Sequence, residues 1–165
     1  MLAAQIAAVH SVASDRKGKQ EMTFKFTVSD LIPAKPTAVY DAWLDGKLHG
    51  KMTGSKAAGS PKVGAKFSAW DGYIKGTNLE LVRRKRIVQS WRTAQFAETD
   101  KDSKITLTLK PVTGGTKILL LHTSVPDGQT GYKDGWRENY FEPMKAYFAK
   151  EKAKKKKAKE KPKGK

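Results

Sequence analysis

The stretch that decides the fold is Phe67 to Arg92, FSAWDGYIKGTNLELVRRKRIVQSWR, which predicts three consecutive antiparallel strands. Asp71-Gly72 separates two apolar runs, and this pair favours a type I′ hairpin turn because both residues tolerate positive φ. The strand that follows is predicted to be half-buried. Its apolar face is expected at Tyr73, Thr77, Leu79 and Leu81, and its wet face at Asn78 and Glu80. The basic turn Arg83 to Arg86 leads into the third strand, and the apolar face of this meander requires a cover.

The cover is predicted near the other end of the chain, where aromatic residues recur at helical spacing. Within a helix expected from Gly131 to Ala149, this stripe consists of Tyr132, Trp136, Tyr140, Phe141, Met144, Tyr147 and Phe148. Pro143 lies inside the stripe and removes one helical hydrogen bond, which predicts a bend. We therefore expect a kinked helix lying against a curved sheet.

The remaining elements follow from alternation and turn signals. Glu21 to Ser29 alternates apolar and polar residues and predicts the first strand. Pro36 suits the first turn of a short helix, and a second short helical piece is expected through Met52. Two further strands are predicted, around Ile105 to Leu109 and from Thr116 to Val125. The fold class is therefore α+β, with a curved antiparallel sheet of about six to seven strands wrapped on a long C-terminal helix and one or two short helices after the first strand.

At 165 residues the chain has the length of one domain. We expect a flexible leader over residues 1–20, a folded domain over residues 21–149 and a disordered Lys-rich tail over residues 150–165. Arg16 is the only arginine of the leader, which disfavours a mitochondrial presequence. The longest aliphatic run, Ile118 to Leu121, is far shorter than the roughly 20 residues of a spanning helix. The sequence therefore predicts a cytoplasmic protein without a membrane span, and we expect a monomer.

The charge of the chain is strongly positive. The formal net charge is +17, of which the ten lysines and two glutamates of Lys150 to Lys165 contribute +8. Such an excess favours acidic partners, although a charged turn or tail also occurs simply as a solvated surface. The candidate electrostatic contacts are Arg83, Arg84, Lys85, Arg86, Lys154, Lys155, Lys156 and Lys157. No recognised motif combines these runs with base-stacking aromatics, so nucleic acid is expected at most as a nonspecific partner.

The sequence shows no catalytic or metal-binding constellation. Cysteine is absent, which excludes disulfides, thiol catalysis and Cys-based zinc sites. None of His10, His49 and His122 has a second ligand at metal-ligand spacing on its own element. His122 shares the parity of the apolar residues of its strand, which favours a satisfied or half-exposed strand histidine over a catalytic one. We therefore predict no enzyme activity, no metal and no cofactor.

Several short motifs occur in a specific order between Met22 and Ala149. They are Asp71-Gly72 with Gly76, Ile87-Val88 before Trp91-Arg92, Thr106-Leu107-Thr108-Leu109, Val125-Pro126, and Gly135-Trp136 followed by Tyr140-Phe141 and Lys145. With the order of elements, they resemble the helix-grip superfamily of START and pollen-allergen-like domains, also called SRPBCC. More closely, the chain resembles the C-terminal domain of the activator of heat-shock-protein-90 ATPase.

The resemblance implies a non-enzymatic co-chaperone module that binds the heat-shock-protein-90 chaperone and modulates its ATPase. The separate N-terminal domain of the full co-chaperone has no counterpart in residues 1–20, so we expect binding with weak or no stimulation. The fold also implies a cavity, and the alternative function is the binding or carrying of a small apolar ligand. Candidates for its lining are Trp43, Tyr73, Leu79, Trp91, Trp136, Tyr140 and Met144. The same side chains could instead fill the interior, and the tail alone would make a nonspecific polyanion binder.

Overall fold

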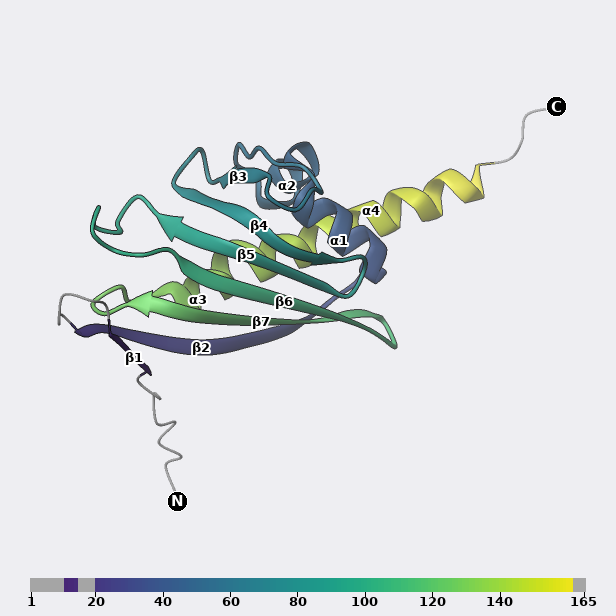
Figure 1. Cartoon of the computed structure of the whole chain (residues 1–165). Coiled ribbons are helices and arrows are strands. Elements are labelled where there is room, and N and C mark those ends of the chain that lie inside the picture. The colour runs from purple at the N-terminus through teal and green to yellow at the C-terminus, as the bar shows by residue number, and fades with distance from the viewer. Residues whose placement is uncertain (1–10, 15–19, 162–165) are drawn as a thin grey trace, which may run out of the picture.

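The computed structural model describes residues 11–14 and 20–161. Its strands form one antiparallel sheet in the order β1-β2-β7-β6-β5-β4-β3. They are β1 (Ser11–Ser14), β2 (Gln20–Ile32), β3 (Lys66–Ala69), β4 (Ile74–Val82), β5 (Arg86–Thr93), β6 (Ser103–Val112) and β7 (Gly115–Pro126). Figure 1 shows the curved sheet with the C-terminal helix lying across one face. The predicted α+β architecture is confirmed, including the central position of the last strand.

Two short helices, α1 (Pro36–Leu44) and α2 (Gly46–Thr53), connect β2 to β3. Pro36 occupies the first turn of α1, where its missing N–H would have had no helical partner. The Asp45 side chain caps α2 by accepting a hydrogen bond from the Leu48 N–H at 2.9 Å. Figure 1 shows both helices at one end of the sheet, with α2 packed beside β3. The two short helices predicted after the first strand are therefore present.

The turn between β3 and β4 lies at Asp71-Gly72, as predicted. Asp71 and Gly72 have φ angles of 56° and 85°. Trp70 also has a positive φ of 53°, and the Tyr73 N–H donates to the Trp70 carbonyl at 3.1 Å. The turn is therefore longer than the two-residue type I′ turn expected, and Tyr73 belongs to it rather than to the strand.

The predicted faces of β4 are inverted as far as Leu79, whereas Leu81 packs against the core as predicted. Ile74 and Asn78 are buried, whereas the side chains of Tyr73 and Leu79 are 38% and 47% exposed. Because side chains alternate along a strand, starting β4 at Ile74 moves the residues as far as Leu79 to the face opposite the predicted one. A β-bulge between Asn78 and Glu80 then shifts the pairing with β5. Leu79 consequently lies on the solvent face.

Gly76 of β4 is required by a close contact with the neighbouring strands. A Cβ at this position would lie 1.9 Å from the Ser90 carbonyl oxygen and 2.6 Å from the ring of Phe67. Phe67 and Gly76 are paired in register between β3 and β4. The missing side chain therefore makes room for the phenylalanine ring that covers it.

The long helix consists of three consecutive segments, α3 (Tyr132–Trp136), the π-helical η1 (Arg137–Phe141) and α4 (Glu142–Glu160). The buried residues of the predicted stripe are Trp136, Tyr140, Phe141, Met144 and Phe148. The π turn directly precedes Pro143, which has no N–H to bond one turn back. The helix therefore contains a widened turn just before Pro143, and the bend predicted there stays a prediction.

The disordered tail predicted for residues 150–165 is wrong as far as Glu160, because α4 continues to that residue. Alanine, lysine and glutamate all favour helices, and the tail only extends a helix that packing up to Phe148 has already nucleated. Glu151 and Lys154 add an ion pair of 3.1 Å three residues apart. Figure 1 shows this part of α4 projecting beyond the sheet. Residues 162–165 lie outside the described residues.

The predicted flexible leader is also partly wrong. Ser11–Ser14 form β1, which pairs with β2 through partners such as Ser11 and Thr23. Residues 1–10 and 15–19 lie outside the described part of the chain. We propose that the folded unit nevertheless has its core within residues 21–149, because the buried hydrophobic residues run from Val28 to Phe148. Within the described residues, no helix is long and apolar enough to span a membrane.

Candidate ligand pocket

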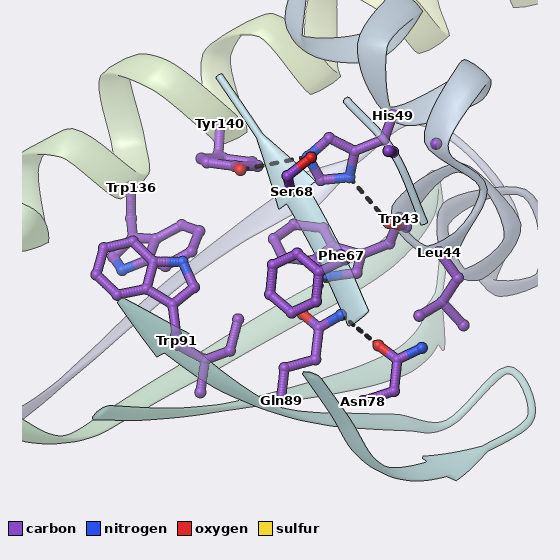
Figure 2. Close-up of a pocket in the computed structure, with 13 residues that line it drawn as sticks. Trp43, Leu44, His49, Phe67, Ser68, Asn78, Gln89, Trp91, Trp136 and Tyr140 are labelled. Carbon is purple, nitrogen blue, oxygen red and sulfur yellow. Dashed lines mark hydrogen bonds between the residues drawn. The ribbon is translucent and has the colours of Figure 1, made fainter. Parts of the chain in front are cut away.

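Aromatic side chains fill the interior between the helix and the sheet. The ring centroid of Trp136 lies 4.7 Å from that of Tyr140, 5.4 Å from Trp91 and 6.1 Å from Trp43. The cavity left beside them has a volume of about 10 Å³, the space of one water molecule. Figure 2 shows these rings converging from the long helix, the sheet and α1. Four of the seven predicted lining residues therefore meet, and here they form a packed core.

The other three predicted lining residues lie apart from one another. Met144 is fully buried in the core. Tyr73 lies at the rim of a second hollow, described below. Leu79 faces solvent on the outer side of β4 and lies far from any cavity lining described here. The inverted faces of β4 explain why Leu79 was assigned to the interior.

A chain of hydrogen bonds runs through the core beside the water-sized cavity. The Trp43 Nε1–H donates to Gln89 Oε1 at 3.0 Å, and Gln89 Nε2 donates to Asn78 Oδ1 at 2.8 Å. Asn78 Nδ2 in turn donates to the carbonyl oxygens of Ser60 and Lys62, both at 2.9 Å. Figure 2 shows the link between Gln89 and Asn78. Because all of these polar groups are paired, two side-chain amides can lie in the core without a desolvation penalty.

His49 of α2 connects the short helices to the long helix. Its Nδ1 donates to the Trp43 carbonyl at 2.8 Å, so its Nε2 accepts from the Tyr140 hydroxyl at 3.2 Å. Burial lowers the pKa of His49 and raises the pKa of Tyr140. The nearby Trp70 indole N–H acts in the opposite direction and lowers the pKa of Tyr140, although its geometry is not that of a hydrogen bond. Both side chains are therefore neutral near pH 7, which suits a structural role.

His122 of β7 was predicted to be either satisfied or half-exposed, and the structure shows it buried with both ring nitrogens hydrogen-bonded. The Trp136 Nε1–H donates to its Nδ1 at 3.1 Å, so its Nε2 carries the proton and donates to Ser103 Oγ at 2.8 Å. Ser103 Oγ in turn donates a hydrogen bond to the Trp91 carbonyl oxygen at 2.7 Å. Burial lowers the pKa of His122 to about 3. Among the described residues, no three His, Asp or Glu side chains are grouped so that they could hold a metal ion.

A larger hollow opens at the α3 end of the core, and we call it the aromatic pocket. Its volume of about 450 Å³ falls within the range of roughly 300 to 1,000 Å³ that is typical of ligand sites. Its aromatic walls are formed by Trp70, Tyr73, Trp91, Tyr132, Trp136 and Tyr140, and its polar groups come from Gln95, Thr130 and Asn139. Among the residues that the structure describes, no acidic or basic side chain lines it. The lining therefore suits an uncharged, ring-shaped ligand with a few polar atoms.

Hydrogen bonds hold one wall of the aromatic pocket in place. The Tyr132 hydroxyl donates to Gln129 Oε1 at 2.7 Å, so it accepts the hydrogen bond from Thr93 Oγ1, also at 2.7 Å. Gln129 Nε2 donates to the Gln95 carbonyl at 3.1 Å. These bonds join the start of α3 to the end of β5, and they pre-organise the pocket before any ligand enters.

Sequence reasoning missed several residues of the aromatic pocket. Tyr132 was available from the helical stripe, and Trp70 from its position beside the Asp71-Gly72 turn. Gln95 and Asn139 carry no such signal, because an isolated amide in a loop or on a helix is usually a solvated surface residue. Only the packing of the long helix and of the segment after β5 beside the β3–β4 turn brings them to one site.

The predicted electrostatic contacts lie at the other end of the molecule, at the β4–β5 turn and on the projecting part of α4 (Figure 1). Residues 83–86 and 154–157 are exposed. Arg86 pairs with Glu80, and Lys154 pairs with Glu151. Arg83 lies near Tyr40 of α1, where its charge opposes the rise in the pKa of Tyr40 that burial causes. The two basic segments thus contribute to one positive end of the protein.

The fold and the buried aromatic cluster define the class of the protein. A curved antiparallel sheet, two short helices after its first long strand and a long C-terminal helix across one face constitute the helix-grip fold of START and SRPBCC-like domains. The profile of the family described as Activator of Hsp90 ATPase homolog 1-like protein matches residues 33–149. The chain belongs to this family.

Comparison with individual proteins agrees with the family. Activator of 90 kDa heat shock protein ATPase homolog 1 of Homo sapiens is 28% identical over 127 residues, covering 76% of this chain but 37% of the human protein. The corresponding Dictyostelium discoideum protein is 26% identical over 136 residues, covering 79% of this chain and 34% of the relative. The chain therefore spans little more than a third of the length of these curated relatives.

Solved structures show the same fold. The crystal structure of an HSP90 activator from Plasmodium falciparum has a TM-score of 0.68 and 26% identity, covering 76% of this chain and 96% of that one. Protein MLL2253 from Mesorhizobium loti has a TM-score of 0.64 and 22% identity, covering 76% and 97%. The second likeness concerns the fold alone.

Proposed function

We propose that this chain is a non-enzymatic module that binds the 90 kDa heat shock protein chaperone. The observation that supports it is the family match over residues 33–149, which extends from α1 to the end of the packed part of α4. The similarity to the Plasmodium falciparum HSP90 activator covers almost all of that chain. Because this chain matches only 37% of the human activator, we expect binding with weak or no stimulation of the ATPase.

The charge of the protein suggests which surface of the chaperone it contacts. A net charge of +17 favours an acidic partner surface, since complementary charges steer the encounter. Arg83, Arg84 and Lys85 lie in or beside an exposed hairpin turn and are the most accessible candidates on the folded domain. The cytoplasmic location and the monomeric state stay predictions of the sequence.

The direct test is calorimetric titration with the purified chaperone, together with its ATPase rate at saturation. Reversing the charge of Arg83, Arg84 and Lys85 to glutamate should weaken binding by about tenfold or more, because it replaces attraction by repulsion. Arg86 is left unchanged because it pairs with Glu80. No measurable binding by the unaltered chain would contradict the proposal.

A matched control comes from three exposed lysines on other strands, Lys25, Lys104 and Lys117. Their replacement by glutamate changes the net charge by the same amount. Binding should then weaken by less than about threefold if the hairpin turn is the contact, because charges outside an interface act only through the screened overall field. Equal losses in the two variants would mean that net charge alone drives association.

The aromatic pocket supports a second candidate function, the binding of a small uncharged ligand. The supporting observation is a pre-formed hollow of about 450 Å³ with six aromatic side chains and, within the described part of the chain, no charged one. Three tryptophans line it, Trp70, Trp91 and Trp136, so their fluorescence should report an entering ring. Titration with 2-naphthol should quench this fluorescence saturably. The charged analogue 2-naphthoate should bind at least about tenfold more weakly, since its carboxylate would lose water without gaining a partner.

Gly135 offers a variant that closes the aromatic pocket without disturbing the fold. Its Cβ would meet only Asn139 Nδ2, at 3.7 Å, and glycine is itself a poor helix former. Gly135→Leu should therefore place a side chain in the hollow, keep the helix and abolish quenching by 2-naphthol. Glu138→Leu, at an exposed position of the same helix, should leave quenching intact. Unchanged quenching in Gly135→Leu would show that the ligand binds elsewhere.

A further inference from the structure

A long groove opens at the end of the molecule that carries α1, the β6–β7 turn and the projecting part of α4. We call it the α4 groove, and its volume is about 790 Å³. Its floor is apolar, with Ala38 from α1, Leu48 from α2, and Tyr147 and Phe148 from α4. Figure 1 shows α4 leaving the sheet beside α1, so the helix forms one wall and continues past the other elements.

One face of α4 supplies the positive charge of this groove. Lys152, Lys155 and Lys159 line it and follow one another at intervals of three and four residues, which places them on one side of the helix. Lys35, just before α1, lines the groove from the opposite wall. All four lysines are exposed. The α4 groove therefore combines an apolar floor with a cationic wall.

The remaining lining decides between classes of partner. Asp41 and Glu151 also line the groove, and their carboxylates would repel a regular run of phosphates, which disfavours nucleic acid. Beyond Phe148 the apolar residues of α4 are alanines, which are too small to insert into a bilayer. A peptide can match both features, because its apolar and acidic side chains alternate on the scale of single residues.

We infer that the α4 groove binds an acidic, partly apolar segment of another protein. The carboxylates of the bound segment contact the lysine side chains of the groove, and the apolar side chains of the segment pack on the apolar floor. Charge complementarity accelerates the encounter, and burial of apolar side chains on the floor prolongs the complex. This site goes beyond the proposed chaperone function and does not depend on it, because the groove is defined by its own lining.

The test uses fluorescence anisotropy with a short labelled peptide of aspartate and glutamate that contains one leucine and one phenylalanine. The whole chain should bind this peptide, and a peptide with serine at the two apolar positions should bind about tenfold more weakly if the floor is used. Replacing Lys152, Lys155 and Lys159 by glutamate should weaken binding of the first peptide by about tenfold or more. Lysine and glutamate have similar helix propensity, so circular dichroism should show an unchanged helix content.

The matched control replaces Lys150, Lys157 and Lys161, which are exposed but do not line the groove. The same change in charge should then weaken peptide binding by less than about threefold, since these residues are not part of the lining and act only through the screened overall field. Equal losses in the two variants, equal binding of the serine peptide, or tighter binding of a DNA duplex would each overturn the inference. Failure to bind the chaperone alongside intact peptide binding would refute only the proposed function.

Discussion

Replacing Gln89 by leucine should reveal how much the hydrogen-bond chain of the core contributes to stability. Leucine has nearly the volume of glutamine, but it leaves the Trp43 Nε1–H and Asn78 Oδ1 without partners. Gln89 and Asn78 are 3% and 2% exposed, so bulk water cannot replace the lost bonds. Each unpaired buried group costs about 1 to 3 kcal/mol, so the free energy of unfolding should fall by about 2 to 6 kcal/mol. The adjoining cavity holds at most one water, so the loss should stay above about 1 kcal/mol.

The assay is urea unfolding followed by circular dichroism, which does not depend on the tryptophans. A double-mutant cycle with Trp43→Phe isolates the bond between the two side chains. In the background without the indole donor, Gln89→Leu should cost about 1 to 2 kcal/mol less, because only the Asn78 oxygen is then left unpaired. Gln95→Leu, at an exposed position, should change stability by less than about 0.5 kcal/mol. Equal effects of Gln89→Leu and Gln95→Leu would refute the reasoning.

Three further predictions follow from the fold. Trp136→Ala should lower the free energy of unfolding by about 3 to 5 kcal/mol in the same assay, and a loss below about 1 kcal/mol would mean that the long helix is peripheral. Because the pKa of His122 is lowered from 6.5 to about 3, the unfolded chain takes up a proton that the folded chain does not. The contribution of neutral His122 to the free energy of unfolding is therefore fully present above pH 6.5 and is lost towards pH 3, by up to about 1.4 kcal/mol per pH unit. The urea midpoint of His122→Gln should accordingly depend less steeply on pH than that of the unaltered protein. Deleting Lys150 to Lys165 should leave the thermal midpoint of unfolding nearly unchanged. Because the deletion removes a charge of +8, the rate of association with the chaperone should depend less steeply on salt concentration. An equally steep dependence would contradict electrostatic steering by the tail.

The sequence by itself determined the architecture of the protein. Alternation along β2 and β6, the positive φ expected at Asp71-Gly72 and the aromatic stripe around Trp136 all depend on local chemistry and on one buried face. The parity that His122 shares with Ile118 and Leu120 likewise predicted a structural strand histidine, either satisfied or half-exposed. The alternation and the aromatic stripe are periodic, so each is read from several residues at once and tolerates a single error. The α+β fold with its helix across a curved sheet could therefore be predicted from the chain.

Only the tertiary structure decided where the polar and charged side chains act. A one-residue difference in the start of β4 turned Asn78 into the core, where Gln89 of the next strand satisfies it. The aromatic pocket depends on the packing of the long helix and of the segment after β5 beside the β3–β4 turn, which no local pattern encodes. The same holds for the lysines of residues 150–161, which the sequence could not tell apart. Because α4 continues past Phe148, Lys155 lines the α4 groove and Lys157 does not. Such partners are distant in sequence, and their meeting is set by packing rather than by the composition of any one segment.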